Sequence, residues 1–129
     1  MAESNLVYLA SPYSHPDPAV RQARYQAACR AAAWLIGQGH LVFSPIAHSH
    51  AIAQHGLPVD WGFWEEQDRR LLAACDELWV LMLDGWEDSR GVQAEVAIAR
   101  KLGKPVGYLA PDLATTSYTL ARVAKEENG

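Results

Sequence analysis

Apolar residues along this chain fall into short continuous runs that alternate with longer stretches of helical spacing. The short runs are bounded by glycine, proline and serine, a pattern typical of buried strands. The expected strands are residues 6–10, 41–43, 77–83 and 105–110. The expected helices begin at Asp17, Asp60 and Ser89, which are good N-cap residues, and end near residues 39, 75 and 103. This alternation predicts a parallel sheet of four or five strands with helices on both faces.

Two further segments carry weaker patterns. Residues 46–59, between the second strand and the second helix, are expected to form a loop, and residues 115–127 are expected to form a last amphipathic helix. No linker or repeat divides the sequence, so residues 1–129 are expected to be one domain. In parallel sheets of this kind ligands bind at the carboxyl ends of the strands. The loops after the first and third strands are therefore the first places to look for a site.

Glu95 lies on the apolar face of the helix that begins at Ser89. At about 100° per residue this face also holds Val92, Val96, Ala99 and Leu102. A carboxylate directed toward the sheet needs a partner, costs several kcal/mol, or does chemistry. Both a buried structural glutamate and a catalytic one remain open on this observation alone.

Asp68 is a second acid in an apolar position. The helix that begins after Asp60 has an apolar arc formed by Trp61, Trp64, Leu71, Leu72 and Cys75, and Asp68 falls inside it. Enzymes that cleave glycosidic bonds usually use two carboxyl groups that converge on a cleft. A structural alternative is an aspartate bonded to a backbone amide or to an arginine.

The two loops at the expected site carry small and polar residues. The first contains Ser11 and Ser14, whose hydroxyls could hold an anion or could simply form a turn. In the second, Gly91 allows a ligand to approach the backbone closely. Trp86 of the same loop could stack on a flat base or sugar face, or could cover the end of the strand.

Three histidines, His48, His50 and His55, follow the second strand. Their spacing matches no established metal motif, so we expect no metal site and favour a role for His48 or His50 in lining a substrate pocket. No organic cofactor is expected, because the sequence has neither a GxGxxG nor a GxxxxGK loop. Cys29 and Cys75 are expected to be small helical residues rather than a disulfide.

Charge and hydropathy narrow the classes of partner and location. The formal net charge of −4 argues against nonspecific binding to nucleic acid, which requires a basic face. No stretch reaches the roughly 20 apolar residues of a membrane span. The first residues lack the basic region and apolar core of a signal peptide, so a cytoplasmic protein is expected.

Together these residues resemble the nucleoside 2-deoxyribosyltransferase-like superfamily, over about residues 6–110. The resemblance includes its branch of 2′-deoxynucleoside 5′-monophosphate N-glycosidases and a small uncharacterised bacterial and phage family. The motifs that carry it are Tyr8-Leu9-Ala10-Ser11-Pro12, Asp68 before Cys75-Asp76-Glu77-Leu78, and Ser89-x-Gly91-x-x-x-Glu95. It implies a flavodoxin-like three-layer α/β sandwich with strand order 2-1-3-4, extended to 2-1-3-4-5 if a fifth strand is present.

The resemblance also implies roles for the acids. Glu95 matches the family's nucleophile, which attacks the anomeric carbon and displaces the base. Tyr8 matches a tyrosine whose hydroxyl orients that glutamate. Asp68 matches an aspartate that contacts the departing base or assists its protonation.

The 5′ end of the substrate would face the serines. Ser11 and Ser14 fall near a serine of the family's first loop, and Ser89 falls where the sugar's 5′ end is contacted. Nucleoside-processing relatives have Asp at this last position and the monophosphate glycosidases have Ser. A serine at a helix N-terminus can donate to a phosphate that an aspartate would repel, so Ser89 beside Arg90 favours a 5′-monophosphate.

The expected function is therefore cleavage or transfer at the N-glycosidic bond of a small nucleotide or nucleoside. A rival from another class is a nucleotide-binding or sensing module without catalysis, because a fold does not fix an activity. By resemblance a homodimer is expected, and the segment Trp61-Gly62-Phe63-Trp64 is a candidate apolar surface for it.

Overall fold

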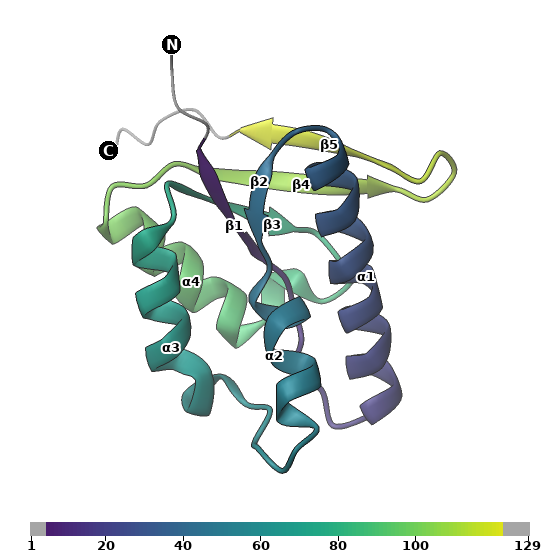
Figure 1. Ribbon diagram of the computed structural model, residues 1–129, viewed down its shortest axis with the longest axis vertical. Helices are drawn as coiled ribbons and strands as arrows, with labels where there is room; N and C mark the ends of the chain where they lie inside the picture. Colours follow the sequence, from purple (N-terminus) through teal and green to yellow (C-terminus); the bar gives the residue numbers. More distant parts are fainter. Residues whose placement is uncertain (1–4, 123–129) are drawn as a thin grey trace.

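Five strands form one sheet in the order β2-β1-β3-β4-β5, as predicted (Figure 1). The computed structural model describes residues 5–122. The strands are β1 (Leu6–Ala10), β2 (Leu41–Phe43), β3 (Glu77–Leu81), β4 (Val106–Asp112) and β5 (Ser117–Arg122). The first four run parallel, and β5 pairs with β4 antiparallel. The parallel strands bring the loops after β1, β2 and β3 to one edge of the sheet.

The predicted N-caps begin their helices through side-chain hydrogen bonds. The helices are α1 (Pro18–Gly37), α2 (Pro45–Ala53), α3 (Trp61–Ala74), the short 3-10 helix η1 (Trp86–Asp88) and α4 (Arg90–Lys101). Asp17, Asp60 and Ser89 each accept from a backbone N–H in the first turn that follows. None of the helices within residues 5–122 has the length and apolarity needed to cross a bilayer.

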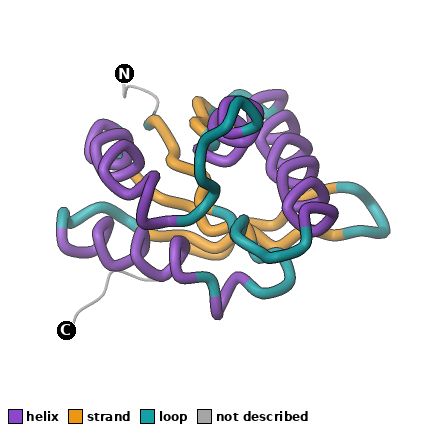
Figure 2. The backbone as a smooth tube through the Cα atoms, turned by 90° about the horizontal axis from the view of Figure 1, so that it is seen from below, coloured by secondary structure: helices purple, strands orange, loops and turns teal. Residues whose placement is uncertain are grey.

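The helices cover the sheet on both faces, which gives the three layers expected (Figure 2). Alternate residues of a strand point to opposite faces. In β1, Val7 and Leu9 pack on the face covered by α1, whereas Tyr8 and Ala10 pack on the face covered by α3 and α4. This alternation puts Tyr8 on the same side of the sheet as Glu95.

Two of the predicted segments were wrong. Residues 45–53 form α2 rather than a loop, because Ser44 caps the helix through the N–H of Ala47 at 3.1 Å and Pro45 supplies its first turn. Residues 117–122 form β5 rather than part of a helix; the remainder of that predicted helix, residues 123–127, lies outside the described residues. The edge of β4 offers Ser117–Arg122 a full ladder of backbone hydrogen bonds, which outweighs a weak helical pattern.

The two cysteines are free thiols. Cys75 is buried at the end of α3, and Cys29 is partly buried in α1. Burial raises the pKa of the Cys75 thiol to about 11, so this thiol is protonated and inert at neutral pH.

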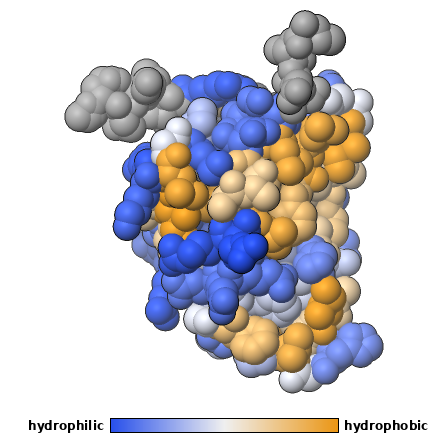
Figure 3. Space-filling model, turned by 60° about the vertical axis from the view of Figure 1, so that its left-hand side comes forward, coloured by the Kyte–Doolittle hydropathy of each residue, from blue (hydrophilic) through white to orange (hydrophobic). Residues whose placement is uncertain are grey.

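The expected apolar surface at residues 61–64 is only partly present. Trp61 and Trp64 are partly buried and line a cavity, and Phe63 alone is well exposed, at 48%. Leu102, predicted to lie on the buried face of α4, is also exposed because the helix ends there. In Figure 3 the apolar side chains of one face lie in separate groups among polar ones. The homodimer stays a prediction.

Candidate active site

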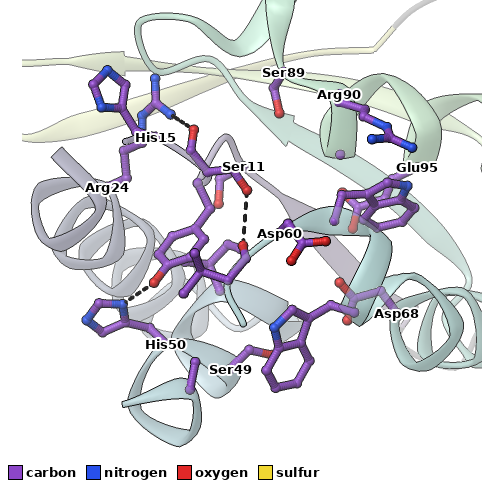
Figure 4. A pocket seen from close by; sticks show the side chains of 18 of the residues that line it. Ser11, His15, Arg24, Ser49, His50, Asp60, Asp68, Ser89, Arg90 and Glu95 are labelled. Atoms are coloured by element: carbon purple, nitrogen blue, oxygen red, sulfur yellow. Dashed lines mark hydrogen bonds between the residues drawn. The ribbon is translucent and has the colours of Figure 1, made fainter. Parts of the chain in front are cut away.

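A cavity of about 460 Å³ opens at the carboxyl edge of the sheet (Figure 4). Its walls come from the loops after β1 and β3, from α1 at Arg24, from α2, and from residues 59–68 and 88–95, which include the beginnings of α3 and α4. Of the residues proposed from the sequence, it is lined by Ser11, Ser14, His50, Asp68, Ser89, Gly91 and Glu95. The site therefore lies where the carboxyl-end rule for parallel sheets places it.

Glu95 lines this cavity and is hydrogen-bonded to Tyr8 of the sheet. The Tyr8 hydroxyl donates to Glu95 Oε2 at 2.6 Å, and Tyr8 itself is fully buried in the layer between sheet and helix. Glu95 is 5% exposed. Burial raises its pKa to about 8; the Tyr8 hydrogen bond opposes this shift and the nearby charge of Asp68 adds to it. Glu95 is thus a buried acid held in one orientation and largely protonated at neutral pH.

Asp68 and Ser11 carry buried polar atoms with no hydrogen-bond partner among residues 5–122. These atoms are Asp68 Oδ1 and Ser11 Oγ, and both residues are about nine-tenths buried or more. Burial raises the pKa of the Asp68 carboxyl to about 6. A buried polar group without a partner is costly, so such groups in a cavity indicate where a ligand or water completes the bonding.

Arg24 of α1 ties the two site loops together, and sequence reasoning missed it. Its Nη1 donates to the Ser14 carbonyl at 3.0 Å and its Nη2 to the Asp84 carbonyl at 3.2 Å. Gly85 follows with φ of +89°, and a Cβ there would lie 2.8 Å from Arg24 Nη2. The positive φ favours glycine at this position, and the absence of a Cβ lets the Arg24 guanidinium approach the backbone. No helical or strand pattern could have indicated an arginine that acts across two loops.

The serine hydroxyls differ in how many of their hydrogen bonds are already made within the protein. Ser14 Oγ donates to the Val59 carbonyl at 3.1 Å, so it braces the first loop. Ser89 Oγ accepts from the Val92 N–H at 3.2 Å, which leaves its own hydrogen free to donate toward the cavity. Gly91, two residues further along the chain, lies beside the Trp61 ring, with 3.5 Å between that ring and a Cβ built on the glycine.

Two predicted substrate contacts lie elsewhere in the structure. Trp86 packs against Tyr108 with ring centroids 5.5 Å apart and is not among the residues that line the cavity, so it covers the strand end. His48 packs against Phe43 at 5.8 Å and is also outside the cavity wall. The reason is that α2 is a helix, on which His48 and His50 point in different directions.

His50 lines the cavity, but both of its ring nitrogens are occupied. Nδ1 is 2.6 Å from the Tyr13 hydroxyl and Nε2 is 3.0 Å from Gln22 Oε1. The ring also stacks on Tyr25 at 4.2 Å. His50 therefore contributes to the wall of the cavity, and its nitrogens have no capacity left for a substrate.

Within residues 5–122 no group of three or more His, Cys, Asp or Glu side chains is arranged to hold a metal ion. The cavity does contain two further carboxylates, Asp88 and Asp60, and Asp60 caps α3 through the Phe63 N–H at 3.1 Å. The sequence indicated its capping role but not its place in the cavity. The arrangement of acids suits attack on an electrophilic carbon with proton transfer to a leaving group.

The family of the chain follows from a protein-family model, described as "Domain of unknown function (DUF1937)", which matches residues 5–110. The chain belongs to the DUF1937 family. The match includes β1, the first loop, both acids and most of β4, so every residue that lines the cavity lies inside the family's domain.

No curated protein matches this DUF1937 chain. Among solved structures it is similar to a 2-deoxyribosyltransferase from the psychrotolerant bacterium Bacillus psychrosaccharolyticus, an enzyme characterised for the synthesis of antiviral and antitumoral nucleosides. The two share 25% sequence identity with a TM-score of 0.56, over 82% of this chain and 72% of the other. The similarity agrees with the flavodoxin-like fold and with the superfamily indicated by the sequence motifs.

Proposed function

We propose that this protein cleaves or transfers the N-glycosidic bond of a nucleoside or nucleoside 5′-monophosphate, with a deoxyribose sugar preferred. The observation that carries the proposal is Glu95, a buried acid oriented by Tyr8 at 2.6 Å and open to a cavity that also holds Asp68. The structural similarity to a 2-deoxyribosyltransferase supports the same class of reaction.

In the proposed reaction an ionised Glu95 oxygen forms a bond to C1′ of the sugar. The bond between C1′ and the base nitrogen breaks, and its electron pair stays with the base, which takes a proton from Asp68. Water or a second base then attacks C1′ and displaces Glu95. With pKa values of about 8 at Glu95 and about 6 at Asp68, the two acids share one proton at neutral pH, and the reactive form is the minor one in which that proton lies on Asp68 and Glu95 is ionised.

The 5′ end of the substrate is assigned to the N-terminus of α4 and the loop after β1. Ser89, at the N-terminus of α4, has a free hydrogen to donate, and Ser11 Oγ has no partner within the described chain. Gly91, in the first turn of α4, also lines the cavity, and Ser14 holds the first loop in place. A helix N-terminus favours an anion, so a 5′-monophosphate is the preferred form of the substrate.

The direct test is incubation of the protein with a panel of nucleosides and 5′-monophosphates, followed by chromatography for free base. We expect base release from at least one deoxynucleoside 5′-monophosphate, and base exchange when a second base is added if the enzyme is a transferase. Binding of a nucleotide without release of base from any member of the panel would instead support a non-catalytic binding module.

Replacement of Tyr8 by Phe removes the hydrogen bond that holds down the pKa of Glu95. We expect the pKa of Glu95 to rise further, so that the form with Glu95 ionised and Asp68 protonated becomes rarer. As a result kcat/KM at pH 7 falls by about 10-fold or more, and the alkaline limb of its pH profile moves to higher pH. The measurement is the pH profile of kcat/KM. Tyr108→Phe, outside the cavity, is the matched control. Identical profiles for Tyr8→Phe and the wild type would show that Tyr8 does not orient the nucleophile.

Replacement of Asp68 by Asn removes the proton donor but preserves shape. We expect kcat to fall about 10²-fold for ordinary bases, because the departing base nitrogen is no longer protonated. A substrate with an N7-methylated guanine departs without protonation and should lose little. An equal loss on both kinds of substrate would assign Asp68 to positioning rather than to proton transfer.

A further inference from the structure

Ser49 of α2 is a third polar group in the cavity without a partner. Its Oγ is buried and has no hydrogen bond among residues 5–122, like Ser11 Oγ and Asp68 Oδ1. The three come from separate elements, namely the end of β1, α2 and α3, and all line one cavity. A serine in a helix can bond to a carbonyl one turn earlier. Ser49 does not, so the hydrogen-bonding capacity of its hydroxyl, which is closed to solvent in the structure, is unused by the described residues.

The face of α2 that meets the cavity is otherwise without free hydrogen-bonding groups. Its residues recur at helical spacing, and they are Ile46, Ser49, His50 and Ala53. Ile46 and Ala53 are apolar, and the nitrogens of His50 are taken by Tyr13 and Gln22. In Figure 4 this wall lies across from Glu95 and Asp68. The wall is therefore neutral and mostly apolar, with one hydroxyl to offer.

We propose that Ser49 is a specificity-determining residue that hydrogen-bonds the departing base. The inference rests on the proposed function, which places the sugar at Glu95 and its 5′ end at Ser89. The remaining part of such a substrate is a flat, uncharged ring with polar edges, and the neutral wall of α2 suits it. One hydroxyl can either donate to a ring oxygen or nitrogen or accept from an amino group. Ser49 thus distinguishes between bases that carry different hydrogen-bonding groups on the edge of the ring that it contacts.

The first test is the stability of the free protein, and Ser44 of the same helix is the matched control. Ser44 Oγ accepts from the Ala47 N–H, so Ser44→Ala should lower the melting temperature by a few degrees. Ser49→Ala removes a buried hydroxyl without a partner and should leave the melting temperature unchanged or raise it. A drop comparable to that of Ser44→Ala would overturn the proposal, because it would show that the hydroxyl serves the fold.

The second test compares kcat/KM for matched pairs of substrates that differ only at the base edge, adenine against hypoxanthine and cytosine against uracil. Ser49→Ala should lower kcat/KM for the preferred base by about tenfold and change the ratio within a pair, whereas Ser49→Thr, which keeps the hydroxyl, should retain it. Unchanged ratios in Ser49→Ala would overturn the proposal.

A third measurement separates failure of this proposal from failure of the proposed function. Free adenine, hypoxanthine, cytosine and uracil are added to the protein and the melting temperature is recorded. A base that stabilises the wild type but not Ser49→Ala supports the role of Ser49 even if no substrate is cleaved. If no free base stabilises the wild type, the α2 wall is not a base site and the proposal falls.

Discussion

Replacement of Glu95 by Gln is expected to reduce base release on the order of 10³-fold or more while the protein remains folded. The amide cannot attack C1′, so the reaction loses its nucleophile. Its oxygen can still accept the Tyr8 hydrogen bond, which in the native protein spans 2.6 Å, and its volume is almost unchanged. The measurement is the rate of free-base production, with circular dichroism as the check on folding.

Two comparisons make this result specific to the nucleophile. Glu66→Gln, an exposed position on α3, should leave the rate unchanged. Mass spectrometry of the intact wild-type protein, quenched during turnover, should detect a glycosyl adduct that Glu95→Gln lacks. Base release from the variant at close to the native rate would remove Glu95 from the mechanism and return it to the role of a buried structural acid.

The fold could be predicted from the sequence where short apolar runs and helix caps agree with tertiary packing. The four parallel strands and the helix starts at Asp17, Asp60 and Ser89 follow from that agreement, whereas the strand order was implied by the family resemblance. The segment 117–122 could not, because its pairing with β4 depends on an edge that no local pattern encodes. The α2 helix was missed because its short pattern, which carries two histidines, resembles a loop.

Some residues of the candidate site could likewise be predicted from the sequence, and others could not. Glu95 and Asp68 were conspicuous because each breaks the apolar face of its own helix, a signal that needs no knowledge of the fold. Arg24 and Ser49 sit on helices where their residue types are unremarkable, and only the folded chain shows that both reach the cavity. Trp86, proposed from the sequence as a substrate contact, packs on Tyr108 and is not among the residues that line the cavity, and the sequence does not show which of the two positions a loop tryptophan beside a strand end takes.

Glu95 should also lower the free energy of unfolding as pH rises, and Glu95→Gln should remove this loss of stability. The pKa of Glu95 is raised from 4.5 to about 8 in the folded protein. Between these values the folded protein holds a proton that the unfolded chain has released, so the free energy of unfolding falls as pH rises. The full shift corresponds to at most about 5 kcal/mol. Asp68, with a pKa raised from 3.8 to about 6, acts in the same direction at lower pH.

Urea unfolding of the two proteins at pH 5, 6.5 and 8 measures this linkage. The variant has no proton to lose at position 95, so the stabilities should be similar at pH 5 and should diverge in favour of Glu95→Gln as pH approaches 8. Curves that stay parallel from pH 5 to 8 would mean that Glu95 is ionised at low pH and shares no linkage with folding. A divergence, together with loss of base release, would mean that the protein keeps a destabilising acid because the reaction needs an ionisable oxygen at this point.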